Sequence, residues 1–127
     1  MKKLTYDEMK QLVWKRRHQG PSVYINPKHK KIHLNTQKAN KNRDKFVFKS
    51  GMVDINFCQQ TSTIEIIDGG NDKKISPKGE KQPNSWSIHD DIVAECLDLT
   101  HPITFDSTFS TDENNNLVIN VDLNKKK

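Results

Sequence analysis

Short runs in which apolar and polar residues alternate with a period of two recur along most of the chain. Such alternation is typical of β-strands that bury one face. The runs that we interpret as strands are residues 22–26, 31–35, 45–49, 52–59, 63–67, 102–109 and 117–123. Most links between them are too short for the crossover that parallel strands need, so the sequence predicts a mainly antiparallel sheet.

An N-terminal helix is indicated by a capping box, because Thr5 and Glu8 have the spacing at which each side chain can bind the other residue's backbone amide. The apolar residues that follow at helical spacing are Met9, Leu12 and Val13. Gly and Pro at positions 20–21 form a stop signal. We therefore expect a helix over residues 5–19 that covers the sheet.

A second, shorter helix is expected at about residues 89–99, with Ser87 as its cap. Its inward-facing residues would be Ile92, Val93, Cys96 and Leu97. Residues 76–85 predict a loop of about ten residues. The fold class we expect is α+β, a mainly antiparallel sheet with an N-terminal helix and a short second helix. It would form a single domain over residues 1–123, followed by a disordered Lys-rich tail at 124–127.

Charge is distributed unevenly along the chain. Residues 1–50 contain 14 lysine and arginine residues against 3 acidic ones, whereas residues 51–127 contain 7 against 13. Such asymmetry suggests that the basic half meets polyanions and that the acidic half meets a basic partner, or the basic half of another copy. The alternative is that the two halves interleave in one sheet, so that the asymmetry largely cancels in space.

Nucleic acid is the first candidate partner. The residues that we expect to contact it are Lys15, Arg16, Arg17, Lys28, Lys30, Lys31, Lys41 and Arg43. Phosphate binding needs such clustered cations, and stacking needs aromatic residues among them, here Trp14 and Tyr24. Neither a helix-turn-helix pattern nor a ribonucleoprotein motif is present, so a solvated basic face is the alternative.

A protein partner is the second candidate. Eight carboxylates and no lysine or arginine lie between Gln82 and Asn124. Trp86 would be the buried anchor of such an interface, and Asp90, Asp91 and Asp98 would orient the encounter. The alternative places Trp86 in the core and leaves the acidic residues as a solvated face.

A metal site could involve His89, Cys96 and His101, but this stretch lacks the paired spacing of structural zinc sites. We therefore expect no cofactor, with zinc as the alternative and Cys96 as a small core residue. No motif fixes a nucleophile, a base and an oxyanion donor together, so we expect a protein that is not an enzyme. Two cysteines in 127 residues favour reduced thiols over a disulfide framework.

Membrane and secretory signals are absent from the sequence. No run of 18 apolar residues occurs, and Asp7 and Glu8 interrupt the region where a signal peptide would have its apolar core. We expect a cytoplasmic protein of a bacterial host cell with no membrane partner.

Two resemblances add to this interpretation. Residues 87–99 and the hairpin 23–34 resemble the short helix and opening strands of swapped-hairpin transition-state regulators, which are dimeric DNA-binding proteins. Asn40-Lys41-Asn42, Asn114-Asn115-Asn116 and Lys125-Lys126-Lys127 give the chain a composition similar to short phage and mobile-element proteins of AT-rich Gram-positive bacteria. Anti-CRISPR proteins come from this class, and the resemblance implies a stoichiometric inhibitor that docks on a nuclease ribonucleoprotein.

The function that the sequence favours is a non-catalytic binding protein. It would act on nucleic acid or on a nucleic-acid-handling complex, in its most concrete form a phage-type inhibitor of a CRISPR nuclease. A DNA-binding transcriptional regulator is one alternative, and a small zinc-containing module or enzyme is another.

Overall fold

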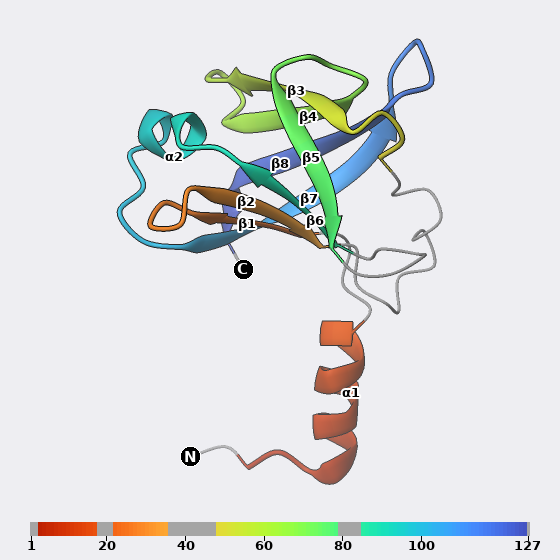
Figure 1. Cartoon of the computed structure of the whole chain (residues 1–127). Helices are drawn as coiled ribbons and strands as arrows, with labels where there is room; N and C mark the ends of the chain where they lie inside the picture. Colours follow the sequence, from red (N-terminus) through yellow and green to blue (C-terminus); the bar gives the residue numbers. More distant parts are fainter. Residues whose placement is uncertain (1–2, 18–21, 36–47, 79–84, 127) are drawn as a thin grey trace.

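The computed structural model describes residues 3–17, 22–35, 48–78 and 85–126. The strands within them are β1 (Ser22–Asn26), β2 (Lys31–Asn35), β3 (Met52–Cys58), β4 (Thr63–Asp68), β5 (Lys73–Lys78), β6 (Ser85–His89), β7 (Ile103–Thr111) and β8 (Leu117–Lys126). The helices are α1 (Tyr6–Arg17) and α2 (Ile92–Cys96) (Figure 1).

The strands form a closed antiparallel barrel in the order β1-β2-β6-β5-β3-β4-β8-β7. Closure comes from β1 and β7, where Ser22 pairs with Asp106 and Ile25 with Ile103. The expected α+β class is therefore wrong, since 54% of the structure is strand and 13% is helix. The antiparallel pairing was predicted, but the closing contact joins segments far apart in sequence, and alternation does not reveal which strand edges meet.

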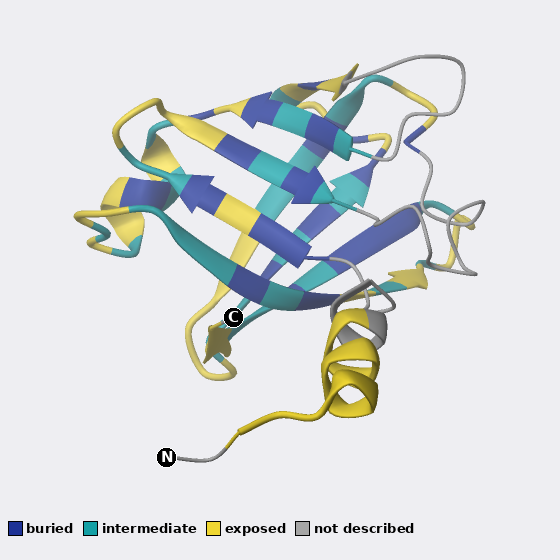
Figure 2. Cartoon of the chain, turned by 90° about the horizontal axis from the view of Figure 1, so that it is seen from below, coloured by how far each residue is buried: buried dark blue, intermediate teal, exposed yellow. Residues whose placement is uncertain are grey.

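The core lies inside the barrel, because each strand turns alternate residues inward (Figure 2). On β1 and β2 the inward residues Val23, Ile25, Ile32 and Leu34 are at most 2% exposed. Each such side chain contributes about 1.5–3 kcal/mol relative to an exposed position, so the period of two dictates which face of each strand is buried.

Helix α1 begins as the sequence predicts. The Glu8 amide donates to Thr5 Oγ1 at 3.2 Å, and the Thr5 amide lies 3.4 Å from Glu8 Oε1, which confirms the capping box. The expectation that this helix covers the sheet is wrong, because every residue from 3 to 13 is exposed (Figure 2). The stop signal at residues 20–21 lies outside the described residues.

The segment between β4 and α2 differs most from expectation. Residues 76–85 were expected to be a loop, but Lys73–Lys78 form β5 and Ser85–His89 form β6. The alternation of apolar and polar residues in β5 and β6 is weak, because both strands are rich in polar residues. The two strands are stable because β6 pairs with both β2 and β5. Ile75, two residues before Pro77, donates its amide toward β3 and away from β6. Residues two apart in a strand direct their backbone amides to the same side. Pro77, which has no amide hydrogen, therefore removes no hydrogen bond to β6.

Three smaller expectations also fail. The second helix is Ile92–Cys96 rather than residues 89–99, and Ile92 and Cys96 are exposed instead of facing inward. Phe48 and Lys49 belong to no strand, and residues 45–47 lie outside the described residues. Residues 124–126 continue β8 rather than forming a disordered tail, because β7 extends far enough for Phe105 to pair with Lys126.

The chain crosses β3 between β4 and β5. Val53 of β3 pairs with Asp68 at the end of β4 and with Lys73 at the start of β5. Residues 69–72 make this crossing, and a Cβ atom on Gly70 would overlap the backbone of Asp54. Glycine is therefore required here by the close approach of two backbones.

Hydrogen bonds fix this crossing, and β5 pairs with only the first part of β3. Asp54 Oδ1 accepts the amides of Asn71 and Asp72 at 2.7 and 3.2 Å. Pairing with β4 covers residues 53–58, whereas pairing with β5 covers only Met52 and Val53. The edge of β3 that faces β5 is consequently left unpaired by that strand beyond Val53.

Candidate nucleic-acid interface

A cleft of about 590 Å³ lies between the chain just before β3 and the β7–β8 hairpin. Lys49 and Ser50 line one wall, residues 109–111 and 115–117 line the other, and Asp68 and Gly69 at the end of β4 complete the lining. We call this site the polar cleft. Its volume lies within the range of about 300–1,000 Å³ that small-molecule sites occupy.

The first wall is held by Asp68, which is only 5% exposed. Its carboxylate accepts the amides of Lys49 and Ser50 at 2.9 and 3.3 Å, and the Ser50 hydroxyl at 2.7 Å. A buried carboxylate needs such donors to offset its lost hydration. The backbone that carries the exposed Lys49 side chain is thereby fixed at the edge of the cleft.

The second wall is held by a turn around Asp112. Its Oδ1 accepts the amides of Asn114 and Asn116 at 2.9 and 2.8 Å. Asn115 has a φ of 64°, a left-handed conformation that asparagine tolerates better than most residues. The turn therefore presents Asn115 and Asn116 to the cleft on a backbone that is already ordered.

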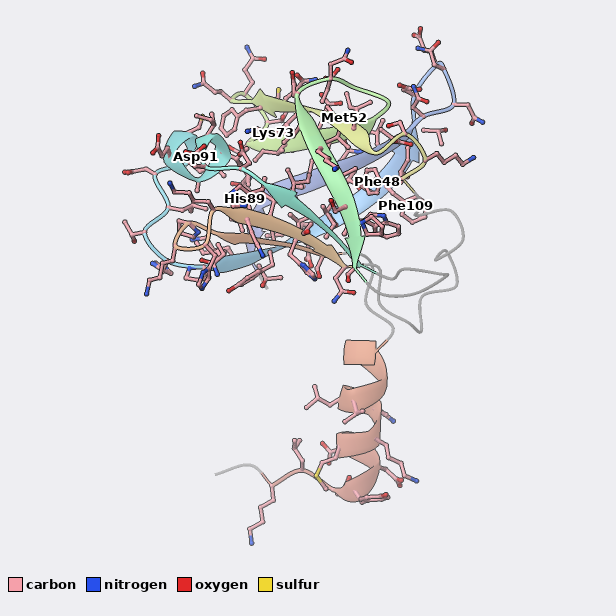
Figure 3. All side chains as sticks on the ribbon, in the orientation of Figure 1. Phe48, Met52, Lys73, His89, Asp91 and Phe109 are labelled. Carbon is pink, nitrogen blue, oxygen red and sulfur yellow. The ribbon has the colours of Figure 1, made fainter. Side chains whose placement is uncertain are left out.

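The chemistry of the polar cleft suits a nucleotide. Lys49 supplies a cation for a phosphate, and the Asn115 and Asn116 amides can both donate and accept hydrogen bonds at base or sugar edges. Phe109 supplies an aromatic ring, the group on which proteins stack unpaired bases. Figure 3 shows Phe48 and Phe109 on the same side of the molecule.

The sequence leading into this site is basic. Residues 36–47 lie outside the described residues and contain Lys38, Lys41, Arg43 and Lys45 against Asp44. The described structure resumes at Phe48, whose ring packs edge-on against Trp86 with 5.5 Å between ring centroids. Lys49 of the polar cleft follows Phe48 directly in the sequence.

The predicted basic residues fall into separate groups. Lys28, Lys30 and Lys31 are exposed in and after the β1–β2 turn, at the end of the barrel next to α2. There the Asp90 amide donates to the Lys30 carbonyl at 2.9 Å, and Lys31 pairs with His89. Basic and acidic segments thus interleave at this end, as the alternative interpretation of the charge asymmetry proposed.

The other predicted nucleic-acid contacts cannot be placed. The side chains of Lys15, Arg16 and Arg17 lie outside the described part of the structure, although their backbone belongs to α1. Lys41 and Arg43 also lie outside the described residues.

The predicted protein-docking residues are mostly structural. Trp86 is 2% exposed and belongs to the core, so its assignment as a surface anchor is wrong. Asp90 is also buried, with Oδ1 3.4 Å from Lys73 Nζ and Oδ2 accepting the Val93 amide at 2.9 Å. It therefore ties β5 to the start of α2. Asp91 is half-buried and Asp98 is exposed, so these two remain available to solvent.

The candidate metal ligands His89, Cys96 and His101 are all exposed. His101 Nδ1 lies 3.1 Å from the Thr100 hydroxyl. Among the residues that the structure describes, no group of three or more His, Cys, Asp or Glu side chains could hold a metal ion. The expectation of a metal-free protein stays a prediction.

Cys58, at the end of β3, has an exposed thiol. Hydrogen bonds from the Thr61 side chain and backbone favour the thiolate and lower the pKa of Cys58 below its ordinary value. A thiol of this kind reacts readily with alkylating reagents. Desolvation and the nearby Glu65 carboxylate oppose this lowering of the Cys58 pKa.

No family model, curated protein or solved structure matches this chain. Among the described residues, neither helix combines the length and apolar character that a membrane span needs.

Sequence reasoning missed the residues of the polar cleft. Asn115 and Asn116 were considered as part of an asparagine-rich composition and not as site residues, and Lys49 and Phe109 only as strand residues. The run of three asparagines was the available signal, because asparagine is over-represented in turns that expose its amide. Its proximity to Lys49 follows from the pairing of β8 with β4, which sequence alone does not show.

Proposed function

We propose that this protein is a non-catalytic, intracellular nucleic-acid-binding protein that holds an unpaired strand in the polar cleft. The observation that carries the proposal is the combination of Lys49, Phe109, Asn115 and Asn116 in one cleft. Phosphate, base face and base edge would each meet a suitable group there.

A polynucleotide fits better than a free nucleotide because of the basic sequence that leads into Lys49. Four lysine and arginine residues between positions 36 and 47 would extend the contact along further phosphates. Each neutralised phosphate releases counterions, which makes binding depend steeply on salt. A free nucleotide would use the cleft alone and show little salt dependence.

The test is fluorescence anisotropy with labelled single-stranded RNA, single-stranded DNA and duplex DNA at several salt concentrations. We expect the single strands to bind more tightly than the duplex. Lys49→Glu should weaken binding at least about tenfold at low salt and reduce the slope of log affinity against log salt by about one unit. The fold should survive, since only the Lys49 backbone amide binds Asp68.

The matched control is Lys125→Glu, the same charge change on the exposed part of β8 far along the strand from the polar cleft. It should bind nearly as the parent does. Equal losses in the two variants would mean that net charge, not the cleft, drives binding. Tighter binding of duplex than of single strands would favour the DNA-binding regulator instead.

The resemblance to swapped-hairpin transition-state regulators covers fewer residues than the sequence suggested, because Ser87–His89 belong to β6 and not to a helix. The nuclease-inhibitor form of the function stays a prediction, with a nuclease ribonucleoprotein as the proposed complex. Co-purification of such a complex with the tagged protein, and its loss in Lys49→Glu, would support it.

A further inference from the structure

Four neighbouring strands of the barrel carry a row of side chains on their outer surface. The row consists of Tyr24 on β1, His33 on β2, Ser87 on β6 and Ser76 on β5, each paired in register with the next. The residue that precedes each of them in its strand is buried, so these four side chains point outward. Adjacent strands lie about 4.8 Å apart, which makes the row about 15 Å wide. We call this surface the sheet platform.

The sheet platform combines an exposed aromatic ring with short side chains. Tyr24 is exposed and lies directly opposite the half-buried His33, so their Cβ atoms are about 5 Å apart. Ser76 and Ser87 are short, so a planar group can approach the sheet there, and their hydroxyls can bond to its edge. Sheet faces stack two or three unpaired bases on aromatic side chains in other single-strand-binding modules.

Two lysines border the sheet platform. Lys31 lies two residues before His33 on β2, and Lys74 lies two residues before Ser76 on β5, so both point outward on the same side of the row. Both are exposed, and neither forms an ion pair with a described residue. Cations of this kind beside an exposed ring suit the phosphates that flank a stacked base.

The outer surface of the next strands has the opposite charge. Glu65 of β4, Asp122 of β8 and Asp106 of β7 each follow a buried residue and point outward, and Asp106 pairs with Asp122. At the end of the barrel next to α2, Asp91 and Glu95 are also acidic. A polyanion would be repelled from these surfaces, so charge directs it to the strands from β5 to β1.

The sheet platform begins beside the wall of the polar cleft. The Ile75 amide of β5 donates to the Gly51 carbonyl at 2.9 Å. Lys49 and Ser50, which line the cleft, directly precede Gly51, and Ser76 of the platform directly follows Ile75. Figure 1 shows β5, β6 and β2 as neighbours, in agreement with the strand order of the barrel. A strand that leaves the cleft past Lys49 therefore meets the platform at β5.

We propose that a single nucleic-acid strand held in the polar cleft continues over the sheet platform. There Tyr24 stacks a base, and Lys31 and Lys74 contact phosphates. This inference rests on the proposed function and adds to it a second contact surface and a direction of the strand, from β5 toward β1. A duplex does not suit the platform, because its base faces are already stacked on one another.

Fluorescence anisotropy with labelled single strands of about 4 and about 12 nucleotides tests the stacking contact. In the parent, the longer strand should bind at least about tenfold more tightly, because only it reaches both surfaces. Tyr24→Thr should weaken binding of the longer strand at least about fivefold, the lower end of what one stacked base contributes. Phe57→Thr is the matched control, because Phe57 is as exposed as Tyr24 but belongs to β3.

The phosphate contacts are tested by the salt dependence of the same binding. Lys31→Gln with Lys74→Gln should reduce the slope of log affinity against log salt by about 1.4 units, at about 0.7 unit for each contact to a single strand. Lys125→Gln with Lys126→Gln, an exposed pair at the end of β8, should leave the slope nearly unchanged. Circular dichroism of each variant verifies that the barrel is folded.

Failure of this inference and failure of the proposed function give different results. If Lys49→Glu weakens binding while the platform variants bind as their controls do, the strand occupies the cleft alone, and this inference is overturned. A parent that binds both lengths equally would also overturn it. Losses in the platform variants with an unaffected Lys49→Glu would refute the proposed function and the continuous path together, as would a parent that binds no single strand.

Discussion

The polar cleft contrasts with an apolar cavity of about 250 Å³ between the β3–β4 hairpin and α2, which we call the apolar mouth. The apolar mouth is lined by residues of β3 itself, whereas the polar cleft lies beside the chain just before that strand. Above the crossing of the chain, the edge of β3 that β5 leaves unpaired borders the mouth. The chain leading into β3 is bound through the Lys49 and Ser50 amides to Asp68 at the end of β4, and it borders the cleft. The crossing at residues 69–72 contributes to both sites, because Gly69 lines the cleft and Asp72 lines the mouth.

The two openings differ in chemistry because different elements line them. The mouth takes Ile55, Phe57 and Ile64 from inward positions of strands, which are apolar because they continue the core pattern. The cleft takes Ser50, Asn115 and Asn116 from turns, where small polar residues satisfy backbone conformations that strands do not use. Secondary structure thus decides the kind of ligand that each opening can take.

Gly70→Ala should have the largest effect, because it disrupts the crossing between β4 and β5, whose residues line both openings. A new Cβ atom would overlap the Asp54 backbone, which cannot turn aside as a side chain can. We expect a loss of about 3 kcal/mol or more in the free energy of unfolding, measured by denaturant titration. Gly51→Ala meets open space and should cost only about 1–2 kcal/mol, from its φ of 79°. Equal costs would mean that the crossing is not tightly packed.

Asp68→Ala and Asp90→Ala compare two buried carboxylates. Asp68 fixes one wall of the polar cleft, and Asp90 links β5 to the start of α2. Loss of Asp68 leaves the amides of Lys49 and Ser50 without their acceptor, and should cost about 2–3 kcal/mol. Loss of Asp90 should cost less, about 1–2 kcal/mol, because the Lys73 side chain is 37% exposed and can turn to water. Thermal unfolding of both variants measures the order, and the reverse order would contradict it.

Thr61→Val should have the smallest effect, confined to the reactivity of the Cys58 thiol. Removing the hydroxyl takes away the largest influence that lowers the pKa of Cys58, so its pKa should rise and less thiolate should be present at neutral pH. Alkylation by iodoacetamide, followed in a Cys96→Ser background, should slow several-fold, and its pH profile should move to higher pH. Lys49→Glu should leave this rate unchanged. An unaltered profile in Thr61→Val would show that the hydroxyl does not stabilise the thiolate.

The strands that the sequence identified correctly have strong local signals. Residues 22–26 and 31–35 alternate clearly, and their bounds coincide with β1 and β2. The cap formed by Thr5 and Glu8 was equally local. Each of these depends on residues within a few positions of one another, which is the range over which pattern and propensity act.

The rest depended on contacts between distant segments. Nothing local in Lys73–Lys78 marks a strand, since its stability comes from hydrogen bonds to β6 and β3. The burial of Trp86 follows from its place between Leu34 and Pro77 in the sheet. The polar cleft requires Lys49 and Asn116 to meet, and the sequence separates them by more than sixty positions.

Closure of the ring between β1 and β7 has a consequence for how the protein acquires its structure. The first strand to leave the ribosome must keep one hydrogen-bonding edge vacant until residues 103–106 have been synthesised. Bringing such distant segments together costs loop entropy before the contacts that stabilise the closed barrel have formed. We therefore expect refolding in about milliseconds to seconds rather than microseconds. During that interval the vacant edge of β1 is a place where nascent chains can pair wrongly, and a holding chaperone would protect it.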